Sequence, residues 1–471
     1  MCDTTKFNRK PLQHVEVLTK KLVKPSSPTP NHLQNYKLSS FDQLTPRSLV
    51  HLVYFYENND SCKGNHDEAG VVQRHEILQI SLAETLSHFR PLAGRISNDG
   101  RRSVDCQDQG ALYIEAKVNC QLNQFLNQAY EDVELLADFI PDGGLNGDGA
   151  LLKVQVTFFL CGGFALTCSI SHTVADGFTG CTFFDEWAKM CGHGKDNNNI
   201  CDIKCLSFNL AATFPSRDLP AVPRPVLRPS AKVVSKLLLF DEFAIKSLKN
   251  KVIEATKSST TIAALHDDID ASVEFRPSRL EVVTAFIWRG LIRAAQKRHG
   301  YLRASMTAIS VNLRGKTALG IEDNSFGNLF VAVPIKFIPD ETKMELHHFV
   351  QLIRTTLQEA RTVYTKASSA DEIFLMVQKF QDQVQKELGD KEVDTRLSTS
   401  LRRFPLYGAD FGWGKPSWII LGNVGGRPEM FCLLDTKCGT GVEVRVNLNE
   451  VEMPIFESDP EIVSVTSVAA R

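Results

Sequence analysis

A dense run of prolines near the middle of the chain limits the folds that this sequence can adopt. Between Phe214 and Ser230 stand Pro215, Pro220, Pro223, Pro225 and Pro229. Proline lacks a backbone N–H and fixes φ, so this run cannot form a helix interior or a central strand. We expect an extended crossover linker over residues 215–230. It divides the 471 residues into two domains of similar size, residues 1–214 and 231–471.

Length and composition agree with more than one globular domain. A single core rarely grows beyond about 250 residues, and the chain is 43% hydrophobic and 23% charged. A formal net charge of −2 lacks the basic excess of a nucleic-acid-binding protein. Residues Met1–Asn8 do not resemble a signal peptide. No stretch approaches the ~20 apolar residues that span a bilayer. We therefore expect a cytoplasmic protein with neither nucleic-acid nor membrane partners.

The twelve cysteines have no spacing typical of a metal site. A zinc site would need a close pair and two further ligands, and the pairs Cys201/Cys205 and Cys432/Cys438 have no matching second pair. Without a signal peptide, most of these residues should be reduced thiols that pack as small hydrophobic side chains. The sequence therefore predicts no bound metal.

Helical and strand patterns alternate in both halves of the chain. Apolar residues recur with helical spacing over 77–89, after which 92–96 is expected to be extended. Two β-rich runs, 152–160 and 164–170, flank a Gly-Gly turn and predict a hairpin. In the second half, Ser278 and Glu281 form a capping box that opens a helix, and 346–364 is amphipathic. The fold class predicted is α/β, with two domains.

The predicted hairpin leads directly into a His-containing turn, Ser171–Gly177. A turn between a strand and a helix holds a side chain firmly and leaves it accessible. Histidine ionises near neutral pH and can accept and return a proton, so His172 is a candidate general base. By spacing alone, a single histidine near a strand end is more often a hydrogen-bonded structural residue than a base, and His172 could also form a helical ion pair with Asp176.

The surrounding residues resemble a known family. HTVADG at His172–Gly177 is similar to the HxxxDG motif of the plant BAHD acyltransferases, and DFGWGKP at Asp410–Pro416 is similar to their DFGWG motif. Three further segments match in the same order. They are Leu82–Arg95, Glu281–Arg289 and Ser325–Asn328. The alkaloid O-acetyltransferase branch is the most similar one, on the residues Val311–Lys316 and Asp435–Gly439.

The resemblance implies two domains of chloramphenicol-acetyltransferase-like topology, with an active-site channel between them. His172 would lie in that channel as the catalytic base, with acyl-CoA entering from one face and the acceptor from the other. Asp176 would point away from the histidine and pair with Arg314. For Asp410 two roles stay open, a second proton acceptor or a structural group in a tight turn. Leu401 stands near the position of a family indole donor, so the developing oxyanion would need another donor.

The same resemblance indicates the acyl donor, the residues that bind it and the acyl acceptor. The cofactor-binding residues expected are Arg314, Gly412 and Lys437, with Lys316 and Arg427 as further candidates for the CoA phosphates. Thr399 or Ser400 could replace the missing oxyanion donor. No permanent cofactor is implied. Acetyl-CoA is the first donor expected and malonyl-CoA the second, and the acceptor would be a hydroxyl of a specialised metabolite such as an alkaloid, on a monomeric enzyme.

Two other functions are compatible with parts of this pattern. Amide-forming condensation domains share the fold and an HHxxxDG motif, but Ser171 occupies the place of their first histidine. An amine acceptor is a related alternative. A non-catalytic binder of small molecules on the same scaffold would explain Leu401, although His172 is intact. A binder would release no free CoA, which distinguishes it from an enzyme.

Overall fold

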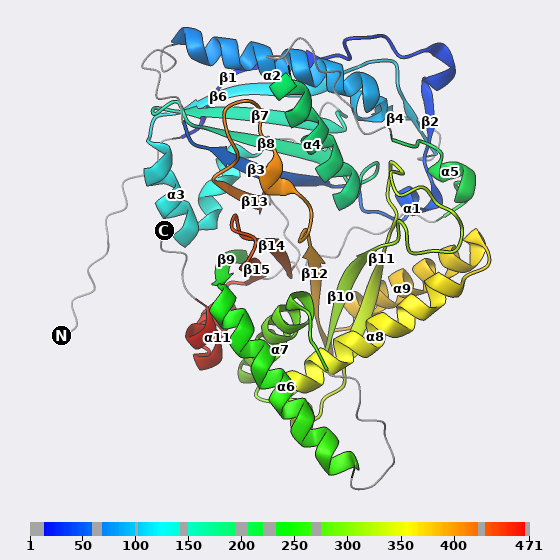
Figure 1. Cartoon of the computed structure of the whole chain (residues 1–471), viewed down its shortest axis with the longest axis vertical. Coiled ribbons are helices and arrows are strands. Elements are labelled where there is room, and N and C mark those ends of the chain that lie inside the picture. Colours follow the sequence, from blue (N-terminus) through cyan, green and yellow to red (C-terminus); the bar gives the residue numbers. More distant parts are fainter. Residues whose placement is uncertain are drawn as a thin grey trace, which may run out of the picture.

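The computed structural model describes residues 14–58, 68–98, 102–141, 149–193, 206–219, 232–264, 275–422 and 429–466. In these residues the chain forms two six-stranded mixed sheets and a small three-stranded sheet. Figure 1 shows the first large sheet lying across one end of the molecule and the second below it, each with its own helices. The α/β class predicted from the sequence is confirmed.

The first sheet has the strand order β1-β6-β7-β8-β3-β13. Only β6 and β7 are parallel, and the other neighbours are antiparallel. Helices α2 and α4 cover one face (Figure 1), and α3 with the 3₁₀ segment η3 covers the other. The bounds are β1 (Glu16–Val23), β3 (Leu49–Tyr56), β6 (Ala111–Val118), β7 (Leu152–Phe159), β8 (Phe164–Ser171), β13 (Trp418–Gly422), α2 (Glu68–His88), α3 (Leu122–Glu131), η3 (Val133–Phe139) and α4 (Gly177–His193).

The second sheet has the strand order β11-β10-β12-β14-β15-β9. Helices α6, α7 and α8 pack on one face and bury a core of aliphatic and aromatic side chains, while α9 packs against β10 and β11 on the other. The bounds are β9 (Val233–Phe240), β10 (Ala304–Asn312), β11 (Phe330–Phe337), β12 (Val393–Ser400), β14 (Met430–Asp435), β15 (Val442–Asn449), α6 (Glu242–Ala264), α7 (Arg279–His299), α8 (Leu346–Lys366) and α9 (Ala370–Gly389).

Shorter elements connect these layers. Strands β2, β5 and β4 form the small sheet beside the N-terminal half. The bounds are η1 (Asn31–Leu33), β2 (Asn35–Lys37), α1 (Ser40–Gln43), η2 (Arg90–Ala93), β4 (Arg95–Ile96), β5 (Ser103–Asp105), α5 (Leu210–Thr213), η4 (Glu341–Lys343), η5 (Leu406–Gly408), α10 (Met453–Glu457) and α11 (Pro460–Val465). Among the described helices, none is long and apolar enough to cross a membrane.

The local sequence patterns predicted most of these elements. The hairpin is confirmed as β7 and β8, whose residues are buried on both faces of the sheet. The capping box that opens α7 is present, with Ser278 and Glu281 each bonding the other's backbone N–H. The prediction that residues 92–96 are extended is wrong for the first two of them. Residues Arg90–Ala93 instead form a 3₁₀ turn, and Pro91 lies in its first turn, where a fixed φ and a missing N–H are favourable.

The proline-rich segment lies mostly outside the described residues. From Phe214 to Leu219 the backbone forms neither helix nor strand, residues 220–230 are not described, and the extended linker over 215–230 stays a prediction. One long-range feature was not predicted. Strand β13, which follows the DFGWG motif, pairs with β3 and completes the first sheet with a strand from the second half of the chain. The assignment of residues 1–214 and 231–471 to separate domains stays a prediction.

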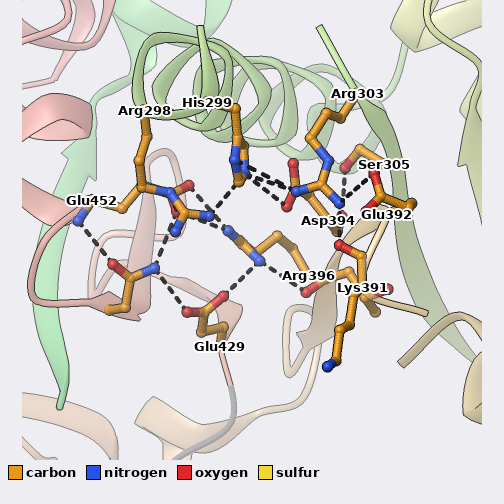
Figure 2. A network of polar contacts seen from close by, with 12 residues as sticks. Arg298, His299, Arg303, Ser305, Lys391, Glu392, Asp394, Arg396, Glu429 and Glu452 are labelled. Carbon is orange, nitrogen blue, oxygen red and sulfur yellow. Dashed lines mark hydrogen bonds and ion pairs between the residues drawn. The ribbon is translucent and has the colours of Figure 1, made fainter. Parts of the chain in front are cut away.

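A buried polar network around Arg396 of β12 stabilises the second sheet. Arg396 donates to both carboxylate oxygens of Glu452 at 3.0 and 3.1 Å, and its other terminal nitrogen contacts Glu429. Figure 2 shows these groups with Arg298, which also pairs with Glu452. The side chains of Arg396 and Glu452 are 3% and 0% exposed. Such buried charges are tolerated only when they are paired and hydrogen-bonded, as they are here.

Candidate active site

A cavity of about 800 Å³ lies between the two sheets. One wall consists of β3, β8 and the start of α4, and the other of β10, β12, β14, β15 and α9. Cavities of several hundred cubic ångström with a few polar groups are typical of small-molecule sites. The cavity therefore lies where two parts of the chain meet, as the channel predicted from the sequence would.

His172 lies directly after β8 and lines this cavity. Its backbone N–H donates to Ser48 O at 2.8 Å, which fixes the turn to the start of β3. The imidazole lies beside the ring of Phe330, with centroids 5.7 Å apart. Burial lowers the pKa of His172 below the ordinary histidine value, because a charged ring is costly in a weakly solvated site. The ring is therefore neutral at physiological pH.

Asn328 determines which nitrogen of His172 carries the proton. The Nδ2 group of Asn328 donates to Asp42 Oδ1 and to the carbonyl oxygen of His172, both at 2.8 Å. Its Oδ1 therefore faces His172 Nδ1 at 3.2 Å, and Nδ1 must be the donor. Nε2 is left with its lone pair, and among the described residues no hydrogen bond joins it to another side chain. A neutral imidazole in this tautomer can accept a proton at Nε2.

Asp42 belongs to the same arrangement, although it is 130 residues from His172 in sequence. Its Oδ1 accepts the backbone and side-chain N–H groups of Asn328, and its Oδ2 accepts the N–H and the hydroxyl of Ser39. Burial raises the pKa of Asp42. The pattern Ser-x-x-Asp at Ser39–Asp42 is a capping box and predicts a helix start, but nothing in it indicates contact with Asn328. Sequence reasoning did not assign either residue to the site.

Asp176 points away from His172 and pairs with Arg314, as the family resemblance implied. Arg314 Nη1 donates to Asp176 Oδ2 at 2.6 Å, and the two side chains are 2% and 6% exposed. The carboxylate also accepts the backbone N–H groups of Leu329 and Thr179, each at 3.0 Å. This pair joins the turn after β8 to the segment between β10 and β11. The geometry indicates that Asp176 orders the loop rather than moving a proton.

The environment of Arg314 leaves little room for the CoA contact expected from the sequence. A guanidinium has five N–H donors. Those of Arg314 bond to Asp176 and Asn312 from Nη1, to Gly327 O and Thr179 Oγ1 from Nη2, and to Ser325 O from Nε. A phosphate could approach only by displacing these partners. Arg314 is better explained as the partner of Asp176.

The DFGWG motif forms a tight turn outside the cavity lining. Asp410 Oδ1 accepts the N–H groups of Gly412 at 2.8 Å and Gly414 at 2.9 Å. Both glycines have positive φ, 92° and 99°, which residues with a side chain rarely adopt. Phe411 is buried against Trp187, with ring centroids 5.0 Å apart. Neither Asp410 nor Gly412 lines the cavity, so the geometry favours the structural alternative for both.

The segment at the end of β12 contributes five consecutive residues to the cavity, from Leu397 to Leu401. Leu401 approaches the start of α4 closely, since a Cβ on Gly177 would lie 3.0 Å from its Cδ2. Ser400 Oγ accepts the N–H of Arg402 at 3.3 Å. The Thr399 hydroxyl has no partner among the described residues. Thr399 is therefore the better placed donor of the two that the sequence left open.

Two groups of basic side chains lie near Leu401, and sequence reasoning identified only Lys316. Burial and the positive charges of Arg361 and Arg403 lower the pKa of Lys316. In the same way, burial and the charges of Arg279 and Arg402 lower the pKa of Lys249. Lys437 is exposed in the turn between β14 and β15, and Arg427 lies outside the described residues. No sequence pattern joins these positions, because they come from five separate segments.

The fold and the site together define a class of enzyme. Two mixed sheets that enclose a cavity, with a neutral histidine open to it at a strand end, are the arrangement of chloramphenicol-acetyltransferase-like acyltransferases. The chain belongs to the Transferase family, whose model matches residues 13–463. This is the BAHD family that the motifs indicated, and the chain is an acyl-CoA-dependent O-acyltransferase.

Individual relatives match over nearly their full length. The chain is 31% identical to salutaridinol 7-O-acetyltransferase of Papaver somniferum, over 94% of this chain and 96% of the relative. It is 32% identical to acetyl-CoA-benzylalcohol acetyltransferase of Clarkia breweri, over 96% and 100%. Its structure is similar to the crystal structure of vinorine synthase, with a TM-score of 0.76 and 29% identity over 96% of this chain and 99% of that one.

Proposed function

We propose that this chain transfers an acetyl group from acetyl-CoA to a hydroxyl of a plant specialised metabolite, with His172 as the general base. The observation that carries the proposal is the open Nε2 of His172, which is neutral and faces the cavity. The names of the relatives support an acetyl donor and alcohol acceptors. An alkaloid acceptor, a cytoplasmic location and a monomeric state stay predictions from the sequence.

The reaction needs only proton transfer and charge stabilisation, because a thioester is already activated. His172 Nε2 removes the proton of the acceptor hydroxyl while its oxygen attacks the thioester carbonyl. The tetrahedral intermediate then expels the CoA thiolate, which receives the proton from the imidazolium. General-base catalysis of this kind contributes roughly 10²–10⁴-fold. Asn328 holds the ring in the reactive tautomer throughout, so we class it as a positioning residue.

Two further contributions follow from the cavity wall. The Thr399 hydroxyl is the candidate donor to the oxyanion, in place of the indole that Leu401 lacks. Hydrogen-bond donors at such a position lower the barrier because they are oriented before charge develops. For the CoA phosphates we propose the basic groups around Lys316 and Lys249 instead of Arg314. Clustered cations attract a polyanionic ligand over several ångström.

A free-thiol assay tests the proposal. The purified chain is incubated with acetyl-CoA and benzyl alcohol or a panel of polycyclic alcohols, and the products are identified by mass spectrometry. Acyl transfer should release one thiol for each ester formed, and His172→Ala should abolish most of it. Malonyl-CoA and amine acceptors serve as the alternative substrates. A chain that binds the alcohols but releases no CoA with any donor would contradict catalysis and support a binding protein.

A further inference from the structure

Two polar side chains at another part of the cavity wall have no role in the mechanism above. They are His51 of β3 and Asn447 of β15, and both line the cavity. Each of them lies near the end of β13. His51 is opposite Gly422 in the β3–β13 pairing, and Arg445, two residues before Asn447, donates to the carbonyl oxygen of Leu421.

His51 is held by one ring nitrogen and leaves the other available. Its Nδ1 lies 2.7 Å from Ser169 Oγ, and its Nε2 has no hydrogen-bond partner among the described residues. Burial, together with the positive charge of Lys153, lowers the pKa of His51 to about 4. The ring is therefore neutral near pH 7. Because the serine hydroxyl can donate or accept, Nε2 can do either as well.

A chain of hydrogen bonds leaves the amide of Asn447 as a donor. Arg445 Nη2 donates to Ser235 Oγ at 3.1 Å, so the proton of that hydroxyl is directed to Asn447 Oδ1 at 2.8 Å. The Nδ2 group has no partner within the described part of the chain. Polar groups in protein interiors are normally hydrogen-bonded. Two unused groups that line the same cavity, one from each wall, therefore indicate a ligand atom that bonds to them.

The distance to His172 shows which substrate can reach this pair. His51 is opposite Ser169 on β8, and His172 follows three residues later. At a rise of about 3.4 Å per residue, the two histidine backbones are roughly 10 Å apart. An acetyl group has only a methyl beside the carbonyl that reacts at His172. It cannot extend this far, so the polar pair is available to the acceptor.

We propose that, given the function proposed above, His51 and Asn447 bind a second oxygen of the acceptor, a hydroxyl or carbonyl whose distance from the acylated hydroxyl is on the order of the 10 Å between the two histidine backbones. The body of the acceptor between the two oxygens is apolar and rigid. The cavity wall between the histidines is lined by aliphatic and aromatic side chains that suit such a body, among them Leu49, Ile170 and Phe330. His51 and Asn447 are thus specificity-determining residues.

Binding of matched probes tests this inference. The probes are a steroid diol with hydroxyl groups at opposite ends of its rigid skeleton, and the two mono-ols that each lack one of them. Dissociation constants are measured by calorimetry for the wild-type chain. We expect the diol to bind roughly tenfold more tightly than the weaker mono-ol, the value of one good hydrogen bond. In His51→Leu, the ratio of the dissociation constants of the mono-ol and the diol should fall towards one. His51→Gln keeps a donor and an acceptor, so it should retain most of the preference for the diol.

Asn447→Leu provides a second variant if His51→Leu fails to fold, and His32→Leu on the surface is the matched control that should keep the preference. Equal binding of diol and mono-ols by the wild type, or no diol binding, would overturn the proposal. So would an unchanged preference in both leucine variants. If the leucine variants have a raised KM for acetyl-CoA but keep the preference for the diol, His51 and Asn447 contact the pantetheine arm of CoA. This result would also overturn the proposal. Acetylation of benzyl alcohol by the wild type tests the proposed function separately.

Discussion

Replacing Asp176 by asparagine separates a structural role from a catalytic one. The carboxylate pairs with Arg314 at 2.6 Å, and both side chains are almost fully buried. Asparagine keeps one acceptor oxygen, so its amide nitrogen would face either Arg314 and the Leu329 N–H or the Thr179 N–H. In either orientation the positive charge of Arg314 stays in the interior without a compensating charge.

The expected cost is large enough to measure. Removing one partner of a buried ion pair costs about 3–5 kcal/mol. For 471 residues that unfold together, an entropy of roughly 2 cal/mol/K per residue amounts to about 1 kcal/mol/K, so the melting temperature should fall by about 3–5 °C. Calorimetry or circular dichroism would record this shift, and thiol release would record the loss of activity.

Two comparison variants complete the experiment. In the double variant Asp176→Leu with Arg314→Met, neither charge is left unpaired, so it should be less destabilised than the sum of the single changes. Glu16→Gln breaks an exposed pair with Lys117, and such pairs contribute little. If Asp176→Asn melts at the wild-type temperature but has lost its activity, our structural assignment is refuted and Asp176 takes part in the chemistry.

Four further results are expected. His172→Ala should keep the wild-type circular dichroism spectrum and lose roughly 10²–10⁴-fold in kcat; a variant with most of the wild-type rate would remove His172 from the mechanism. Asn328→Ala should lower kcat about tenfold or more while binding of acetyl-CoA changes little, because the tautomer of His172 is no longer set. Because burial lowers the pKa of His172 and the neutral ring is the active base, the acid limb of kcat/KM against pH should have its midpoint below the ordinary value of about 6.5; a midpoint above that value would contradict the burial argument. Arg396→Met should lower the melting temperature by less than about 5 °C, because the buried carboxylate of Glu452 loses the Nη2 group that bonds both of its oxygens but keeps its pair with Arg298, with the exposed Glu16→Gln as the comparison.

The local elements of this protein were determined by its sequence. The hairpin β7–β8, the capping box at Ser278 and the amphipathic helix α8 are encoded by residues a few positions apart, whose periodicity and hydrogen bonding are nearly independent of the rest of the chain. The motif at His172 likewise indicated a reactive side chain in a turn. The pairing of Asp176 with Arg314 came from the family resemblance and not from any local pattern.

Only the tertiary structure decided how these elements combine. The hydrogen bonds from Asp42 through Asn328 to His172 join residues up to 286 positions apart. Strand β13 pairs with the first sheet although it comes from the second half of the chain. The basic groups near Lys316 and the polar pair His51 and Asn447 also come from separate segments. Such contacts depend on which faces of distant elements pack together, and no short stretch of sequence contains that information.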